Sequence, residues 1–347
     1  MLSSRFWSLL ALTALVGCAS GKVGTIAAPS DDSGAAQSGS DDGGDDGGTD
    51  VSSGSGTDGG GGDDGGDEGG DDGGDEGGDD GGDAGGDDGG SESDPLDTRP
   101  AGDVDYAAST ESVDIDSDCE MDVTVLTPDA PPVGVVVVSH GFIRSGDKVL
   151  GWAEHYASWG FLVVVPELCH LSARDTDHEA NGQELARLVD ILDLGDAAFV
   201  GHSAGGLASA LAVSLDAGSL GGVGLDPVDA SNLGATAPAG APFYGLFGEP
   251  SRCNSDNNGV MMVTAEALAV SEAGHCDFES PKDSVCDLAC REDNPTFSDD
   301  DLQVTIRALS TAALFGLVGD TATADAWWSP GGTFYDALAA DGAISGI

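Results

Sequence analysis

The segment from residue 31 to residue 90 is the feature that most limits how this chain can fold. It contains 26 Gly and 21 Asp or Glu, and large apolar side chains are nearly absent from it. Such a segment buries too little apolar surface to offset the backbone entropy that folding costs. We therefore expect a disordered, Gly/Asp-rich tether over residues 19–100 and one folded domain over residues 101–347, which is long enough for a substantial core.

The charge of the chain excludes a large class of partners. Asp and Glu number 63 against 11 Lys and Arg, so the formal net charge is −52. Nucleic-acid binding needs a basic surface that displaces counterions from phosphates, so we expect no nucleic-acid partner. Ordered calcium binding by the tether is also disfavoured, because calcium-binding nonapeptide repeats carry an apolar residue in each turn and the Asp-Gly units here do not.

Residues 1–18 have the pattern of an export signal. One cation precedes an apolar run over residues 6–16, which is too short to span a bilayer as a helix. The sequence Leu-Val-Gly-Cys that ends at Cys18 resembles the lipobox of bacterial lipoproteins. That resemblance implies cleavage before Cys18 and its acylation, and two or more acyl chains anchor a protein durably. We expect a lipid-anchored protein of the bacterial cell envelope, or a secreted protein if the signal is an ordinary one.

The cysteines after Cys18 are even in number in an exported domain, which favours disulfide bonds. A zinc site is the alternative, because Cys286 and Cys290 have the spacing of metal ligands, but no second close pair accompanies them. We expect three disulfide bonds and no metal, with a pairing that the sequence leaves open. The six cysteines are Cys119, Cys169, Cys253, Cys276, Cys286 and Cys290.

The domain alternates between short apolar runs and amphipathic stretches, which indicates an α/β fold. Residues 134–139 form an almost unbroken run of valines, as in a strand that is buried on both faces of a sheet. Strand, helix and strand in this order imply right-handed crossovers and a mostly parallel central sheet with helices on both faces. We expect strands at 123–126, 134–139, 161–165, 197–200, 221–225, 241–248 and finally 261–270, and helices at 149–159, 179–192, 207–216 and 302–317.

The sequence Gly-His-Ser-Ala-Gly at residues 201–205 matches the pattern Gly-x-Ser-x-Gly. An expected strand precedes it and an Ala-rich helix follows, which is the context in which a serine stands on a sharp turn at the edge of a sheet. The first N–H groups of such a helix are unpaired where an oxyanion would form. We expect Ser203 to be a nucleophile, and a strand–helix turn without chemistry is the alternative.

A serine nucleophile needs a base, and histidine is the usual one. His275 directly follows the expected last strand and fits the chain order serine, acid, histidine. His202 adjoins Ser203 and is expected to point elsewhere, because neighbouring side chains on a strand face opposite sides. Asp226, at the end of the strand 221–225, is the expected acid, and Glu249, one strand later, is its alternative.

The remaining candidate groups are expected to have structural roles. His140 ends a buried strand and should shape a loop, while the other histidines should lie at the surface or pack. Acidic residues are usually solvated, and we expect this of Asp229 and Asp277.

Three short motifs resemble the chlorophyllase branch of the α/β-hydrolases. They are Gly-His-Ser-Ala-Gly-Gly at 201–206, Asp-Pro-Val-Asp at 226–229 and Gly-His-Cys-Asp at 274–277. Residues 135–142 and 156–166 are also similar to cutinase-like polyester hydrolases and platelet-activating-factor acetylhydrolases. Ala204 stands where chlorophyllases usually carry Arg, so the resemblance implies ester hydrolysis rather than chlorophyll as the substrate.

The resemblance also implies further features of the site. The backbone N–H groups of Phe142 and Ala204 would form an oxyanion hole, and a disulfide between Cys253 and Cys276 would brace the acid and histidine loops. We expect a monomer that hydrolyses a small ester or a polyester through an acyl-enzyme, a mechanism that requires no cofactor. A thioesterase or peptidase of the same fold, or a non-catalytic binding lipoprotein, is the alternative.

Overall fold

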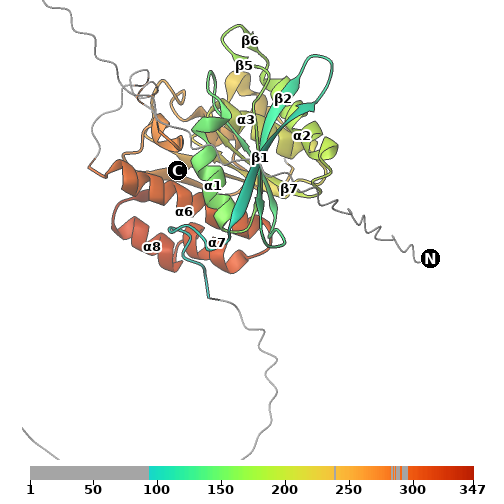
Figure 1. Cartoon of the computed structure of the whole chain (residues 1–347). Coiled ribbons are helices and arrows are strands. Elements are labelled where there is room, and N and C mark those ends of the chain that lie inside the picture. Colours follow the sequence, from blue (N-terminus) through green and yellow to red (C-terminus); the bar gives the residue numbers. More distant parts are fainter. Residues whose placement is uncertain (1–93, 238–239, 283, 285, 287–289, 291–295) are drawn as a thin grey trace, which may run out of the picture. The chain divides into compact units, whose positions relative to one another are not determined.

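The computed structural model describes residues 94–347, except for 238–239, 283, 285, 287–289 and 291–295 (Figure 1). The expected signal sequence, the lipidation site Cys18 and most of the expected tether lie outside these residues. Within the described part of the chain, no helix combines the length and the hydropathy that crossing a bilayer requires.

A mostly parallel sheet of nine strands forms the centre of the folded part, in the order β1-β2-β4-β3-β7-β8-β9-β10-β11. Neighbours from β4 to β10 pair in parallel, while β1, β2 and β11 are antiparallel to their neighbours at the two edges. The expected α/β class with a mostly parallel sheet is therefore confirmed. The strands of this sheet are β1 (Tyr106–Asp114), β2 (Glu120–Pro128), β3 (Val135–Ser139), β4 (Leu162–Pro166), β7 (Ala197–His202), β8 (Gly221–Leu225), β9 (Phe243–Phe247), β10 (Ala267–Val270) and β11 (Ile344–Gly346).

Helices cover both faces of the sheet, with α1 and α6 on one face and α2 and α3 on the other (Figure 1). The valines of β3 supply both cores, because successive side chains of a strand point to opposite faces: Val136 and Val138 to one, Val137 to the other. The helices are α1 (Leu150–Ser158), α2 (His178–Ile191), α3 (Ala204–Leu215), α4 (Leu233–Thr236), α6 (Asp299–Leu317), α7 (Thr321–Trp328) and α8 (Thr333–Ala340). The shorter elements are the hairpin of β5 (Leu171–Ser172) and β6 (Asp175–Thr176) and the 3-10 helices η1 (Gly146–Lys148), η2 (Ala230–Asn232), η3 (Asn258–Met262) and η4 (His275–Phe278).

The register of the central strands determines where their loops meet. His202, the last residue of β7, is paired with Leu225, the last residue of β8. Ser203 and Asp226, the next residue of each strand, therefore leave the sheet side by side at its carboxyl edge.

The end of the sheet differs from the expectation of one final strand at residues 261–270. The first part of this range belongs to η3, and only Ala267–Val270 is a strand. Met262 is buried against Leu207 and Leu211 of α3, so its side chain serves that contact rather than the sheet. The final strand is β11, which was not expected because its 3 residues are too few to show a pattern.

The packed part of the chain begins before the expected tether boundary at residue 100. Thr98 is fully buried, and its hydroxyl donates to the carbonyl of Ala308 at 2.8 Å. The backbone of Leu96 is bound on both sides, by the hydroxyl of Thr323 and by the indole of Trp327. These contacts attach the segment to α6 and α7.

Candidate active site

Ser203 occupies the turn between β7 and α3. Its backbone angles are φ 55° and ψ −121°, a combination that non-glycine residues rarely adopt. The strand and helix come very close around it: a Cβ at Gly201 would lie 2.2 Å from the carbonyl oxygen of Gly205, and a Cβ at Gly205 would lie 2.4 Å from that of His140. The two glycines of the motif are therefore required for the turn that presents the hydroxyl.

His275 connects Ser203 with Asp226. Its Nδ1 donates to the Asp226 carboxylate at 2.6 Å, which directs the Nε2 lone pair to the Ser203 hydroxyl at 3.0 Å. All three residues are buried, with exposed fractions of 8% for Ser203, 6% for His275 and 0% for Asp226. The structure thus brings together three expected site residues that are 72 and 49 positions apart.

The Asp226 carboxylate is held by donors from the loop that follows β9. The Gly248 N–H donates to it at 3.0 Å, and the Nδ2 of Asn254 donates at 3.1 Å. A buried carboxylate needs such bonds to compensate for its lost hydration. Sequence reasoning missed Asn254, which is itself fully buried, because nothing near it in the chain indicates a partner 28 positions away.

Three other acidic residues lie outside this arrangement. Glu249, the alternative acid, is exposed and accepts a hydrogen bond from the N–H of Glu272. The expectation that Asp229 and Asp277 are solvated is wrong, since each is 2% exposed. Asp229 accepts from two N–H groups of α4, and Asp277 binds Lys282 at 2.7 Å, so each finds local donors that permit burial.

His202 does not point away from the site as expected. Its ring centroid lies 4.7 Å from that of His275, and its Nε2 donates to the His275 carbonyl at 3.1 Å. Strand alternation does not apply here, because β7 ends at His202 and the positive φ of Ser203 redirects the chain. Complete burial, followed by the repulsion that a protonated His275 and the Arg144 guanidinium exert on a charged ring, lowers the pKa of His202 well below its usual value, so this ring stays neutral.

The other histidines are structural. His140 shapes the loop after β3: its Nε2 accepts from the N–H of Leu168, and its Nδ1 donates to the carbonyl of Gly141. His155 is buried on α1, and His178 is the first residue of α2. His170 contacts Asp175 and Glu184; burial alone lowers its pKa, but these carboxylates outweigh that effect and raise it.

Phe142 and Ala204, the residues expected to form the oxyanion hole, both lie next to Ser203: Phe142 lines the same hollow, and Ala204 follows Ser203 in the chain. A Cβ on Gly141 would lie 3.2 Å from the Cβ of Ser203, which shows how closely the loop after β3 approaches the hydroxyl. Ala204 is the first residue of α3. Neither N–H donates to any residue that the structure describes. Both N–H groups are therefore available to an acceptor from outside the chain.

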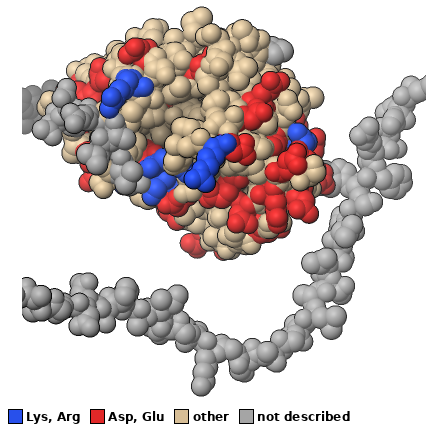
Figure 2. Space-filling model, turned by 90° about the horizontal axis from the view of Figure 1, so that it is seen from above, with Lys and Arg blue, Asp and Glu red and all other residues tan. Residues whose placement is uncertain are grey.

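A hollow of about 390 Å³ opens beside Ser203 and His275. Figure 2 shows the face above the carboxyl edge of the sheet, which is hollowed near its centre with Lys and Arg side chains close by, while Asp and Glu gather to one side. The wall includes the half-exposed side chains of Phe142 and Ile143. It also includes cysteines of two disulfide bonds, Cys253–Cys290 and Cys276–Cys286. Such a wall suits an apolar group attached to a reacting carbonyl.

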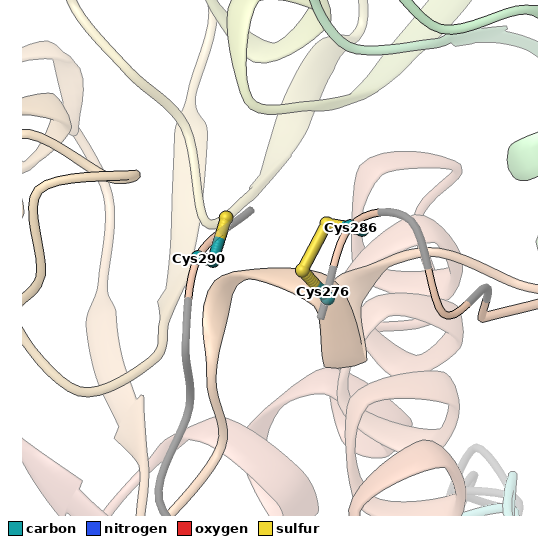
Figure 3. Close-up of side chains that lie close together, drawn as sticks. All are labelled: Cys276, Cys286 and Cys290. Carbon is teal, nitrogen blue, oxygen red and sulfur yellow. A yellow bond between two sulfur atoms is a disulfide. The ribbon is translucent and has the colours of Figure 1, made fainter. Parts of the chain in front are cut away.

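The cysteines form three disulfide bonds, as expected, but one expected pair is wrong. Cys253 is bonded to Cys290 and Cys276 to Cys286, while Cys119 is bonded to Cys169. Figure 3 shows Cys286 and Cys290 beside Cys276, and the three sulfurs lie within 4.8 Å of one another. The acid loop and the histidine loop are thus not bonded to each other: each is bonded to a cysteine that follows η4, Cys290 or Cys286.

Two groups of side chains have the spacing of metal ligands among the described residues. One is Cys276, Cys286 and Cys290, and the other is Cys119, Cys169 and Glu184. Every sulfur in both groups belongs to a disulfide, which lacks the thiolate that zinc binds. In the oxidised state neither group fits a metal ion.

Comparisons with known proteins do not assign the chain to a family. The chain matches no protein-family model, and no curated protein matches it. The geometry of the site therefore carries the functional argument.

Proposed function

We propose that this chain is a serine hydrolase of the α/β-hydrolase fold that cleaves carboxylic esters. The observation that carries the proposal is that the imidazole of His275 contacts both the Ser203 hydroxyl and the Asp226 carboxylate. His275 accepts from the Ser203 hydroxyl at 3.0 Å and donates to a buried carboxylate at 2.6 Å. A neutral hydroxyl is a poor nucleophile, and this arrangement is the one that activates it.

The reaction proceeds in two steps of acyl transfer. Ser203 attacks the ester carbonyl as His275 takes its proton, and the N–H groups of Phe142 and Ala204 stabilise the oxyanion. His275 then protonates the leaving alcohol. Water, deprotonated by the same imidazole, releases the acid from the acyl-enzyme. Asp226 maintains the tautomer of His275 and stabilises the imidazolium that forms.

The substrate is an ester with a compact apolar portion, either a small molecule or a polymer chain end. The open hollow of about 390 Å³ with its apolar wall supports this choice. Thioesters and peptides react by the same chemistry, so their cleavage is an outcome that the activity assay must separate.

We further propose that the protein acts as a monomer at the cell envelope, with Cys18 acylated and residues 19–93 as the spacer to the bilayer. The short apolar run before Cys18 supports export, and the disulfide bonds fit an oxidising compartment. Replacing Cys18 by Ala should move the protein from the detergent phase to the aqueous phase in a partition assay. Wild-type protein in the aqueous phase would contradict the anchor.

The activity is tested with p-nitrophenyl esters of increasing chain length and with a fluorophosphonate probe. Wild-type protein should hydrolyse the shorter esters and become labelled. Ser203→Ala should lower kcat by about 10³-fold or more and abolish labelling, because the nucleophile is gone. Ser209→Ala is the matched control, since Ser209 is a fully buried serine of α3 whose hydroxyl has no hydrogen-bond partner among the described residues.

Three results would separate the alternatives. Wild-type protein that neither turns over esters nor reacts with the probe is a binding protein. Higher kcat/KM for thioesters or peptides than for matched esters would assign another substrate class. Retained ester hydrolysis in Ser203→Ala would remove Ser203 from the mechanism.

A further inference from the structure

The residue before the nucleophile contacts the base through its side chain. His202 and Ser203 are consecutive, yet each bonds to a different part of His275: the Ser203 hydroxyl to its imidazole and the His202 ring to its backbone carbonyl. We propose that His202 is a positioning residue that keeps the His275 imidazole within reach of Ser203. This inference rests on the proposed hydrolase function.

The need for such a contact follows from where His275 lies. It begins η4, a 3-10 helix of 4 residues that follows β10 through a short turn. Asp226 binds its ring, and a disulfide joins the next residue, Cys276, to Cys286, but neither bond fixes the backbone of His275 relative to β7. His202 belongs to β7, in the interior of the sheet, and is 2% exposed. The bond of 3.1 Å from its Nε2 therefore ties the base to the strand that carries the nucleophile.

The protonation of His202 is determined by its partners. A carbonyl can only accept, so the Nε2 that binds the His275 carbonyl carries the proton. The other nitrogen, Nδ1, is buried and has no hydrogen-bond partner among the described residues. The nearest carboxylate oxygen, Oε1 of Glu279, is 4.0 Å from Nδ1.

Glu279 is kept from taking part in that protonation by Arg144. The guanidinium of Arg144 donates to both oxygens of the fully buried Glu279 carboxylate at 2.6 Å. This bidentate pair neutralises the charge that would otherwise draw a proton onto His202. The charged and titratable groups facing His202 are thus His275, Glu279, Arg144 and His140.

A neutral His202 matters during the reaction. When Ser203 attacks, His275 becomes an imidazolium whose ring centroid is 4.7 Å from that of His202. A second cation at that distance in a buried site would oppose proton transfer, whereas a neutral ring does not. His202 therefore positions the base without competing for the proton.

The test uses two substitutions of similar length, His202→Gln and His202→Met, in the full-length protein. Gln can place an N–H donor near the position of Nε2, and Met cannot. We expect His202→Met to lower kcat for a p-nitrophenyl ester and the limiting rate of fluorophosphonate labelling by about 10-fold to 30-fold, the loss of one buried hydrogen bond. KM should stay within about twofold, because His202 lines the hollow but is only 2% exposed, and His202→Gln should restore kcat to within about threefold of wild type.

Each other outcome contradicts the inference. Wild-type kcat in His202→Met would show that the bond is dispensable, and an equally slow His202→Gln would show that the donor is not the cause. A rise in KM alone would show that His202, which lines the hollow, acts by contacting the substrate and not by positioning the base. If His202→Met does not fold, His202→Phe, which keeps a ring without a donor, takes its place. A wild-type protein without activity or labelling would overturn the hydrolase proposal itself, whereas active variants would overturn only the role of His202.

Discussion

Two buried histidines of the same domain show what separates a base from a packing residue. His275 at the carboxyl edge of the sheet and His155 on α1 are 6% and 4% exposed. Both nitrogens of His275 have side-chain partners, a carboxylate and a hydroxyl. His155 binds only the carbonyl of Thr98, and its Nδ1 has no hydrogen-bond partner in the described part of the chain.

The comparison shows that burial without a carboxylate partner lowers the pKa of a histidine so far that the ring cannot act as a base near neutral pH. Burial, and then the charge of Arg307, lowers the pKa of His155 to about 3, so near neutral pH this ring keeps the one proton that it donates to Thr98 and does not take up a second. His275 lies just as deep but faces Asp226, whose negative charge can stabilise an imidazolium. The partner, rather than the depth, distinguishes the two regions.

The largest expected effect comes from removing the negative charge that faces His275, which leaves this ring without a carboxylate partner, as His155 is. Asp226→Asn keeps the shape of the side chain but removes the charge, so the imidazolium loses its stabilisation and the tautomer can reverse. We expect kcat to fall by about 10³-fold to 10⁴-fold. Steady-state kinetics with a p-nitrophenyl ester measure this fall. A fall of less than tenfold would mean that another group acts as the acid.

A second test separates the disulfides near the site from the distant one. Replacing Cys276 and Cys286 by Ala opens a loop of 10 residues beside His275 and should lower the free energy of unfolding by about 2.7 kcal/mol and kcat about tenfold. Replacing Cys119 and Cys169 opens a loop of 50 residues and should cost about 4 kcal/mol with kcat unchanged.

Urea unfolding and kinetics on both double variants measure these effects. Equal losses of kcat in the two variants would show that the Cys276–Cys286 disulfide has no special relation to the base. An unchanged stability after either replacement would contradict the entropic argument.

The third test addresses His155 through pH. Its pKa is about 3 in the folded state and near 6.5 in the unfolded state, so the unfolded chain binds the extra proton. Its contribution is complete above pH 6.5 and is lost as pH falls toward 3. Between pH 6 and 4.5 wild-type protein should therefore lose about 2 kcal/mol more than His155→Gln, which keeps a donor for Thr98 but does not titrate.

Urea unfolding of both proteins across this pH range provides the measurement. Parallel curves would show that His155 titrates normally and that the two histidines do not differ as described. The kcat of His155→Gln should equal that of wild type, because α1 contributes no group to the reaction.

The smallest expected effect belongs to Glu249→Gln. Its carboxylate is exposed and accepts from the N–H of Glu272, a bond that Gln can also accept. We expect kcat and KM within about twofold of wild type, and this variant is the matched control for Asp226→Asn. A loss near that of Asp226→Asn would make Glu249 the acid after all.

The local sequence pattern was sufficient to predict the central parallel strands of the sheet, but it was insufficient to predict the strands at its two edges. The valine run of β3 and the strand–turn–helix around Ser203 depend on neighbouring residues, so they could be predicted from the sequence. The strand β1 could not, because most of its side chains are exposed and it therefore shows no apolar alternation. The short β11 and the segment of 94–100 that packs on α6 and α7 depend on partners far away in the chain.

The candidate site divides in the same way. Ser203, His275 and Asp226 follow strands in a chain order that could be recognised, and the structure brings them together. The sequence could not predict the role of Asn254, the contact between His202 and His275, or the pairing of the cysteines. Each of these depends on a group 28 or more positions away or on the path of a loop.

The sequence by itself determined the α/β class, the turn that carries Ser203 and the even set of cysteines, since these follow from short-range periodicity, backbone sterics and composition. Only the tertiary structure decided which cysteines pair, which carboxylate faces His275 and where the His202 ring points. Those choices depend on distances across loops that are far apart in the chain, and such distances exist only once the sheet has assembled.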